Sequence, residues 1–130
     1  MRRTGTACLL LAAAALAGCG GGGGGSGKSV TVKAGQPVRF TADEYKFDPK
    51  SVTLDAGGKA ATLAVRLHNS GSLAHDLRVK RGGQELGGTS IILNGKDARA
   101  SVRLTPRTYT FFCSVGDHEA LGMKGSLTVK

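Results

Sequence analysis

Glycine spacing constrains the fold of this chain more than any other feature of its sequence. From residue 28 onward, single glycines, glycine pairs and Asn-Gly separate short runs rich in valine, leucine and threonine. No segment has the 3.6-residue apolar repeat of a long helix. Many short strands with frequent turns predict an all-β sandwich. The expected strands are residues 29–33, 38–41, 51–54, 61–68, 75–80, 89–93, 98–105, 108–113 and 126–130, with 82–88 left open between a short helix and an irregular segment.

The N-terminus has the pattern of an export signal. Arg2 and Arg3 precede an apolar stretch at residues 7–17, which is shorter than the roughly 20 residues that a spanning helix needs. The tetrad Leu16-Ala17-Gly18-Cys19 resembles the bacterial lipobox, and this resemblance implies cleavage before Cys19 and attachment of lipid to it. The alternative is ordinary secretory cleavage near a cysteine without such a role.

The rest of the chain divides into a tether and one domain. Residues 20–27 contain only glycine and serine, a composition typical of a flexible linker. We therefore expect a lipoprotein signal peptide at residues 1–18, a lipidated cysteine with its tether at 19–27, and a single domain at 28–130. The protein would be exported and held by lipid on the cell membrane, facing the periplasm or the cell exterior.

The segment from Cys113 to Met123 gathers metal-binding side chains in one loop. It contains a thiol, the imidazole of His118 and a thioether. Cys113 has no partner for a disulfide in the expected domain, and a lone thiol in an oxidising compartment needs burial or a metal. Two sulfurs with imidazole nitrogens suit copper, and two histidines, one cysteine and a weak axial methionine are the pattern of a blue-copper centre. His75 can supply the second imidazole, because distant strand ends meet at one end of a β-sandwich.

Strand alternation favours His75 over His68 as the second histidine. Alternate residues of a strand face opposite sides of the sheet. His75 begins an inward-facing row with Leu77 and Val79, and Cys113 ends the corresponding row of the 108–113 strand. Asp76 and Phe112 are then expected to face outward. His68 is out of phase with the apolar residues of its own strand, so we expect it on the surface and not at a metal.

These motifs resemble those of the plastocyanin/azurin-type cupredoxins over essentially all of residues 28–130. The similar segments are Tyr45–Pro49, Asn69–His75 and Tyr109–Cys113 with its continuation to Val129. The resemblance implies a Greek-key sandwich that binds one type 1 copper ion, cycling between Cu(II) and Cu(I). The implied ligands are His75, Cys113, His118 and Met123. The implied function is one-electron transfer between a redox donor and acceptor, such as a cytochrome, an oxidase or a reductase.

Two positions next to the expected ligands depart from the family pattern. The family often has asparagine after the first histidine, where it helps to join the two ligand-bearing segments, but this chain has Asp76. A carboxylate there can accept the same hydrogen bonds, and its charge should lower the reduction potential. Gly116-Asp117 stands where many relatives have Pro-Gly. Together with Asn69, Asp76 is expected to support the ligands without binding copper.

Other functions remain as alternatives. A purely structural Cys113 leaves His118 and Met123 unexplained, and a Cys113–His118 nucleophilic dyad lacks a recognisable orienting group or oxyanion hole. We therefore do not expect an enzyme. Copper sequestration or delivery is the alternative to electron transfer, and a metal-free immunoglobulin-like adhesion domain applies only if copper does not bind.

The charge of the chain bears on its partners. The net charge is +9, and it falls to +7 when Arg2 and Arg3 leave with the signal. A basic domain can be attracted to an acidic redox partner or to an anionic bilayer, and salt weakens either attraction. Nucleic-acid binding is not expected, because the sequence has no dense run of lysine and arginine. We expect a monomer.

Overall fold

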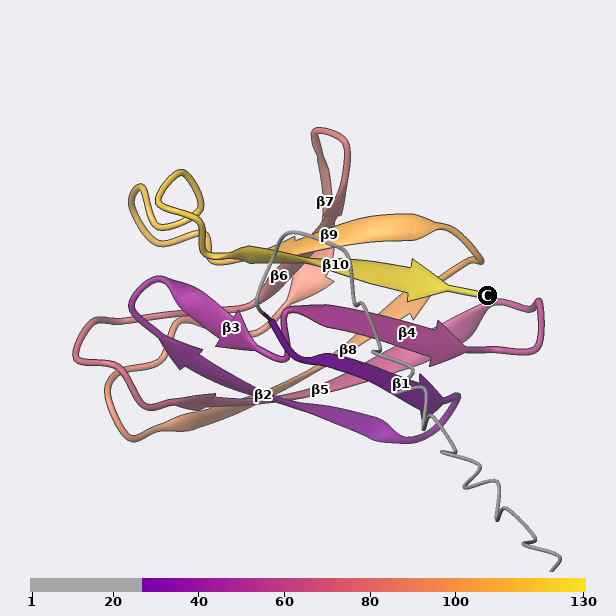
Figure 1. Ribbon diagram of the computed structural model, residues 1–130, viewed down its shortest axis with the longest axis horizontal. Coiled ribbons are helices and arrows are strands. Elements are labelled where there is room, and N and C mark those ends of the chain that lie inside the picture. Colours follow the sequence, from indigo (N-terminus) through magenta and orange to yellow (C-terminus); the bar gives the residue numbers. More distant parts are fainter. Residues whose placement is uncertain (1–26) are drawn as a thin grey trace, which may run out of the picture.

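The computed structural model describes residues 27–130, so the predicted signal peptide, Cys19 and most of the tether lie outside the described residues. The described chain forms two β-sheets packed face to face (Figure 1). One sheet has the order β1 (Ser29–Lys33), β4 (Ser51–Asp55), β10 (Lys124–Val129), β9 (Thr108–Phe112), β6 (Arg78–Arg81), β7 (Gln84–Gly88). The other has the order β3 (Lys46–Asp48), β2 (Pro37–Asp43), β5 (Ala61–Asn69), β8 (Asp97–Leu104). The predicted all-β sandwich is confirmed.

The core lies between the two sheets, where the strands place alternate apolar residues. In β5, Leu63, Val65 and Leu67 are each 1% exposed, while the residues between them face outward. Phe111 of β9 meets Phe40 of β2 edge-on, with ring centroids 5.0 Å apart. Burying side chains of this size contributes about 1.5–3 kcal/mol each. Among the described residues, no helix has the length and apolar character needed to cross a membrane.

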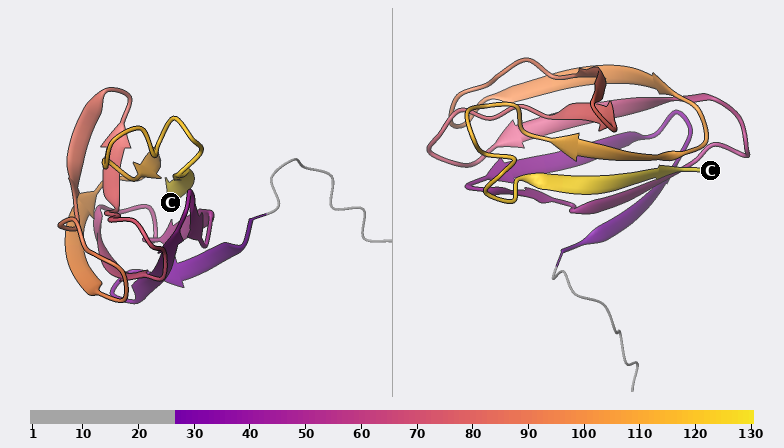
Figure 2. Two further views of the ribbon diagram at one scale, coloured as in Figure 1. Left: turned by 90° about the vertical axis from the view of Figure 1, so that its left-hand side faces the viewer. Right: turned by 90° about the horizontal axis from the view of Figure 1, so that it is seen from above.

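Strand directions bring three connections to one end of the sandwich. β2 and β5 run parallel, with Ala42 opposite Asn69, so both strands end there. β9 and β10 are antiparallel, with Phe112 opposite Lys124, and the loop at residues 113–123 therefore starts and finishes at the same end. This end lies on the left in Figure 1 and faces the viewer in the left view of Figure 2.

Two predicted strands differ from the structure. Residues 75–80 form a regular strand only from Arg78 onward, and His75 makes an isolated bridge to Ile92. That bridge is also the only strand-like pairing in the predicted 89–93 strand. Conversely, residues 84–88 form strand β7, and β3 was not predicted. Gly88 explains the close return of β7 onto β6, because a Cβ there would overlap the carbonyl oxygen of Leu77.

Strand alternation correctly predicts which side chains face the core, but it is wrong for Asp76 and Phe112, which it places on the surface. His75, Leu77 and Val79 are fully buried, and His68 lies on the surface against Asp97. Asp76 and Phe112 were expected to face outward, but they are only 2% and 8% exposed. Asp76 is buried because the chain is not yet in a regular strand there. Phe112 is covered by the ammonium group of Lys80, which lies 4.3 Å from the ring centroid.

Candidate metal centre

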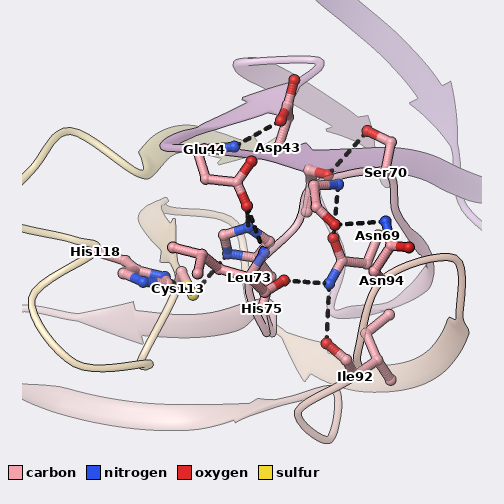
Figure 3. Close-up of polar contacts among 12 residues, drawn as sticks. Asp43, Glu44, Asn69, Ser70, Leu73, His75, Ile92, Asn94, Cys113 and His118 are labelled. Carbon is pink, nitrogen blue, oxygen red and sulfur yellow. Dashed lines mark hydrogen bonds and ion pairs between the residues drawn. The ribbon is translucent and has the colours of Figure 1, made fainter.

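Three donor side chains converge at the end of the sandwich. The Sγ atom of Cys113 lies 3.8 Å from Nδ1 of His75 and 3.5 Å from Nδ1 of His118. The three donor atoms all lie within 4.8 Å of one another (Figure 3). All three residues are buried: the exposed fraction is 1% for Cys113, 0% for His75 and 7% for His118. Within residues 27–130, no other group of three histidine, cysteine or acidic side chains comes this close together.

Met123 closes the loop that carries Cys113 and His118. Its backbone carbonyl accepts the Cys113 N–H at 3.1 Å, and its own N–H donates to the His118 carbonyl at 3.0 Å. The side chain of Met123 is fully buried and belongs to the hydrophobic core. Gly122, immediately before it, has a φ of 105°, a conformation that favours glycine. The last residue of the loop, Met123, thus lies beside its first residue, Cys113, and its thioether faces the core.

Asn69 holds the chain segment that leads to His75. Its side-chain amide donates to the carbonyls of Leu73 and Ile92 at 2.8 and 2.9 Å, and its Oδ1 accepts the Gly71 N–H at 2.9 Å. Asn69 is fully buried. These three bonds use most of the hydrogen-bonding capacity of the amide. They support a segment whose strand-like pairing is limited to the bridge between His75 and Ile92.

Asp76 joins the two segments that carry His75 and Cys113. Its Oδ1 accepts the Ser114 N–H at 2.7 Å, and its Oδ2 accepts the Ser114 hydroxyl. A carboxylate at this position therefore accepts hydrogen bonds from the residue that follows Cys113. The buried carboxylate thus belongs to the residue that follows His75 and binds the residue that follows Cys113.

Glu44 was missed by the sequence analysis. It lies in the turn between β2 and β3, and its Oε1 is 3.2 Å from Nε2 of His75 (Figure 3). The same oxygen accepts the Leu73 N–H at 2.7 Å. That backbone hydrogen bond is the main reason why the pKa of Glu44 is lowered to about 2, with smaller contributions from bonds to Asp43 and His75. An acidic residue in a turn carries no sequence signal that would place it beside a histidine 31 positions away.

The surroundings of His118 are aromatic and closer to solvent. The ring of Tyr45 meets the His118 ring edge-on, with centroids 5.0 Å apart. Leu121, in the same loop, is 52% exposed. His118 retains a small exposed surface, whereas His75 has none.

The donor set fits a single type 1 copper site. Two imidazole nitrogens and the sulfur of Cys113 face one another, and the buried thioether of Met123 lies in the same loop. Burial raises the pKa of the Cys113 thiol, because desolvation disfavours the thiolate. A bound cation offsets that cost, so the thiolate and a metal stabilise each other.

Comparisons with known proteins agree with this geometry. The model of a family described as copper-binding proteins of the plastocyanin/azurin family matches residues 26–130. Reduced auracyanin from Roseiflexus castenholzii is similar in structure, with a TM-score of 0.65, 21% identity, and coverage of 75% of this chain and 98% of that one. Rusticyanin from Thiobacillus ferrooxidans has a TM-score of 0.63 and 21% identity, covering 81% and 84%.

An azurin from Methylomonas sp. strain J has a TM-score of 0.64 and 16% identity, covering 75% of this chain and 99% of that one. At these identities the structural likenesses show the shared fold, while the family match comes from the sequence itself. No curated protein sequence matches the chain.

Proposed function

Because the chain belongs to the plastocyanin/azurin family of copper-binding proteins, we propose that it is a one-electron carrier, tethered to a membrane by lipid. The observation that carries this proposal is the convergence of His75, Cys113 and His118, three buried residues whose donor atoms lie within 4.8 Å of one another. Fold and donor types agree on one chemistry, and the chain is not proposed to be an enzyme.

The four predicted ligands have distinct roles in this proposal. Cys113 would supply a thiolate, His75 and His118 would supply two imidazole nitrogens, and Met123 would supply a thioether to the copper ion. A bound copper ion supplies reversible one-electron exchange. The contribution of the protein is to hold these donors in one arrangement in both oxidation states and to keep water away by burial. Little rearrangement is then needed when an electron moves.

We place the electron entry and exit at His118. It is the more exposed of the two histidines, and Leu121 beside it is 52% exposed. Residues 120–122 therefore offer a small surface on which a redox partner can approach the imidazole. Tyr45 packs against the ring and keeps it in place.

The basic surface bears on the kind of partner. Arg39, Arg66 and Arg99 are cross-strand neighbours in β2, β5 and β8, so like charges lie side by side. Within residues 27–130, none of the three forms an ion pair with an acidic side chain. This row supports an acidic redox partner or an anionic membrane surface near the domain. The proposed lipid on Cys19 and the glycine-rich tether would keep the domain at that membrane.

Copper binding is tested by spectroscopy on the purified protein. Titration with Cu(II) should produce an intense blue thiolate-to-copper band and narrow EPR hyperfine splitting. The Cys113→Ser variant should lose both, and His68→Ala, which removes a surface histidine, should keep both. If one equivalent of copper gives no such band in the wild type, the electron-carrier proposal is wrong. Colourless binding would instead favour copper sequestration or delivery.

The lipid anchor needs a separate test in cells. Metabolic labelling with a fatty-acid probe should label the wild-type chain and leave Cys19→Ser unlabelled. The wild type should fractionate with membranes. An unlabelled wild-type protein would contradict the tether while leaving the copper proposal unaffected.

A further inference from the structure

The carboxylate of Glu44 lies directly behind the more deeply buried histidine of the metal centre. Its Oε1 is 3.2 Å from Nε2 of His75, while Nδ1 of the same ring faces Cys113 (Figure 3). The two ring nitrogens of His75 thus point to two different partners. Among the described residues, His75 is also the only histidine of the centre with a carboxylate at hydrogen-bonding distance from its ring.

The position of this carboxylate is determined by its neighbours. The Leu73 N–H donates to Oε1 at 2.7 Å, and the Glu44 N–H donates to Oδ1 of Asp43 at 2.8 Å. Gly71 leaves the necessary space, because a Cβ there would lie 2.5 Å from Oε1. Asn69 in turn binds the Gly71 N–H. The side chain of Glu44 is 26% exposed, so the contact is partly shielded from water.

The contact has a defined consequence for the protonation of the ring. An ionised carboxylate can only accept hydrogen bonds, so the proton of a neutral His75 resides on Nε2. Nδ1 then keeps its lone pair for a metal at the Cys113 side. Carboxylate–histidine–metal arrangements of this kind orient the ring and increase the basicity of the ligating nitrogen.

We propose that Glu44 is a positioning residue that selects the metal-binding tautomer of His75 and lowers the reduction potential of the bound copper. The selection of the tautomer follows from the contact between Glu44 and His75 and does not depend on copper. The potential part rests on the proposed function, because a stronger nitrogen donor and a nearby negative charge both favour Cu(II) over Cu(I). Within the described part of the chain, His118 has no such carboxylate, so the asymmetry between the two histidines is electrostatic as well as geometric.

The tautomer is measured first, in the copper-free protein, by nitrogen-15 NMR of the imidazole rings at neutral pH. His75 should carry its proton on Nε2 in the wild type, and Glu44→Ala should lose this strong preference. A wild-type His75 with its proton on Nδ1, or an unchanged tautomer in Glu44→Ala, would overturn the positioning role. Thermal unfolding of both proteins shows whether the variant keeps its fold.

The potential is measured next, in the copper-loaded protein. Glu44→Gln keeps the size of the side chain and removes its charge, so it should raise the reduction potential and weaken Cu(II) binding about 10- to 100-fold. Glu119→Gln is the matched control, because it removes the same charge from the metal-binding loop at a carboxylate paired with Lys80.

Three results distinguish the possibilities. A clearly larger rise in potential for Glu44→Gln than for Glu119→Gln supports the proposal. Equal shifts in the two variants overturn the tuning role, because they would reflect net charge alone. If the wild type forms no blue site, the proposed function and the potential part fail together, and the NMR result alone decides whether Glu44 positions His75.

Discussion

The two histidines that face Cys113 are held in different ways. The segment of His75 is fixed by side chains from other parts of the fold, namely Asn69 at the end of β5 and Glu44 in the β2–β3 turn. The segment of His118 is held mainly by backbone hydrogen bonds within its own loop and by the ring of Tyr45. One side of the centre is therefore anchored in the sandwich, whereas the other is a surface loop.

This difference separates two tasks that a redox site must combine. Buried side-chain hydrogen bonds resist rearrangement, because breaking one leaves a polar group unsatisfied. A surface loop can approach a partner and tolerates change, because little depends on its exposed side chains. We infer that the His75 side maintains the ligand geometry and the His118 side provides access. Four further experiments test this division, beginning with the one that should have the largest effect.

The largest effect is expected for Asn69→Ala. The variant loses three hydrogen bonds in a fully buried position and leaves the carbonyls of Leu73 and Ile92 without this donor. The free energy of unfolding should fall by about 2–4 kcal/mol, measured by denaturant titration of the copper-free protein. Asn94→Ala, which removes one bond to Gly71, is the control and should cost about 1 kcal/mol. Equal losses would show that the His75 segment is not specially anchored.

Asp76→Asn should have a smaller effect on stability and a measurable effect on potential. The amide oxygen can still accept the Ser114 N–H, so the free energy of unfolding should change by no more than about 1 kcal/mol. Loss of the charge should raise the reduction potential, as redox titration can show. A potential that is unchanged or lower would contradict the expectation for this departure from the family pattern.

Tyr45→Leu tests the main side-chain contact of the His118 side. It removes the edge-on aromatic contact with His118 and keeps an apolar side chain. The expected loss is about 0.5–1.5 kcal/mol of unfolding free energy, together with altered EPR parameters for the copper site. A loss of unfolding free energy as large as that of Asn69→Ala would show that the His118 side is anchored as firmly as the His75 side.

Leu121→Ala should leave stability within about 0.5 kcal/mol of the wild type, because the side chain is 52% exposed. The substitution should instead lower the rate of electron self-exchange, which NMR line broadening measures. The blue band should be unchanged. Leu86→Ala, in β7, is the control for removing an exposed leucine elsewhere and should not affect the exchange rate.

The candidate donor residues could be proposed from the sequence because their signals are local. Cys113, His118 and Met123 lie in one loop, and strand alternation selects His75 rather than His68. The structure brings His75, Cys113 and His118 together in this way. The same alternation failed at Asp76 and Phe112, because it assumes a regular strand and a single buried face. Asp76 precedes β6, and Phe112 is covered by Lys80 from the neighbouring strand.

By itself, the sequence determined the fold class and the types of ligand, since both follow from short-range patterns of apolar residues, glycines and metal-binding side chains. Only the tertiary structure decided that Glu44 lies behind His75 and that Asp76 is buried against Ser114. These pairs are 31 and 38 residues apart, and strand order and register bring them together. A hydrogen bond between polar side chains has no periodicity along the chain, so its partners become visible only when the sheets are assembled.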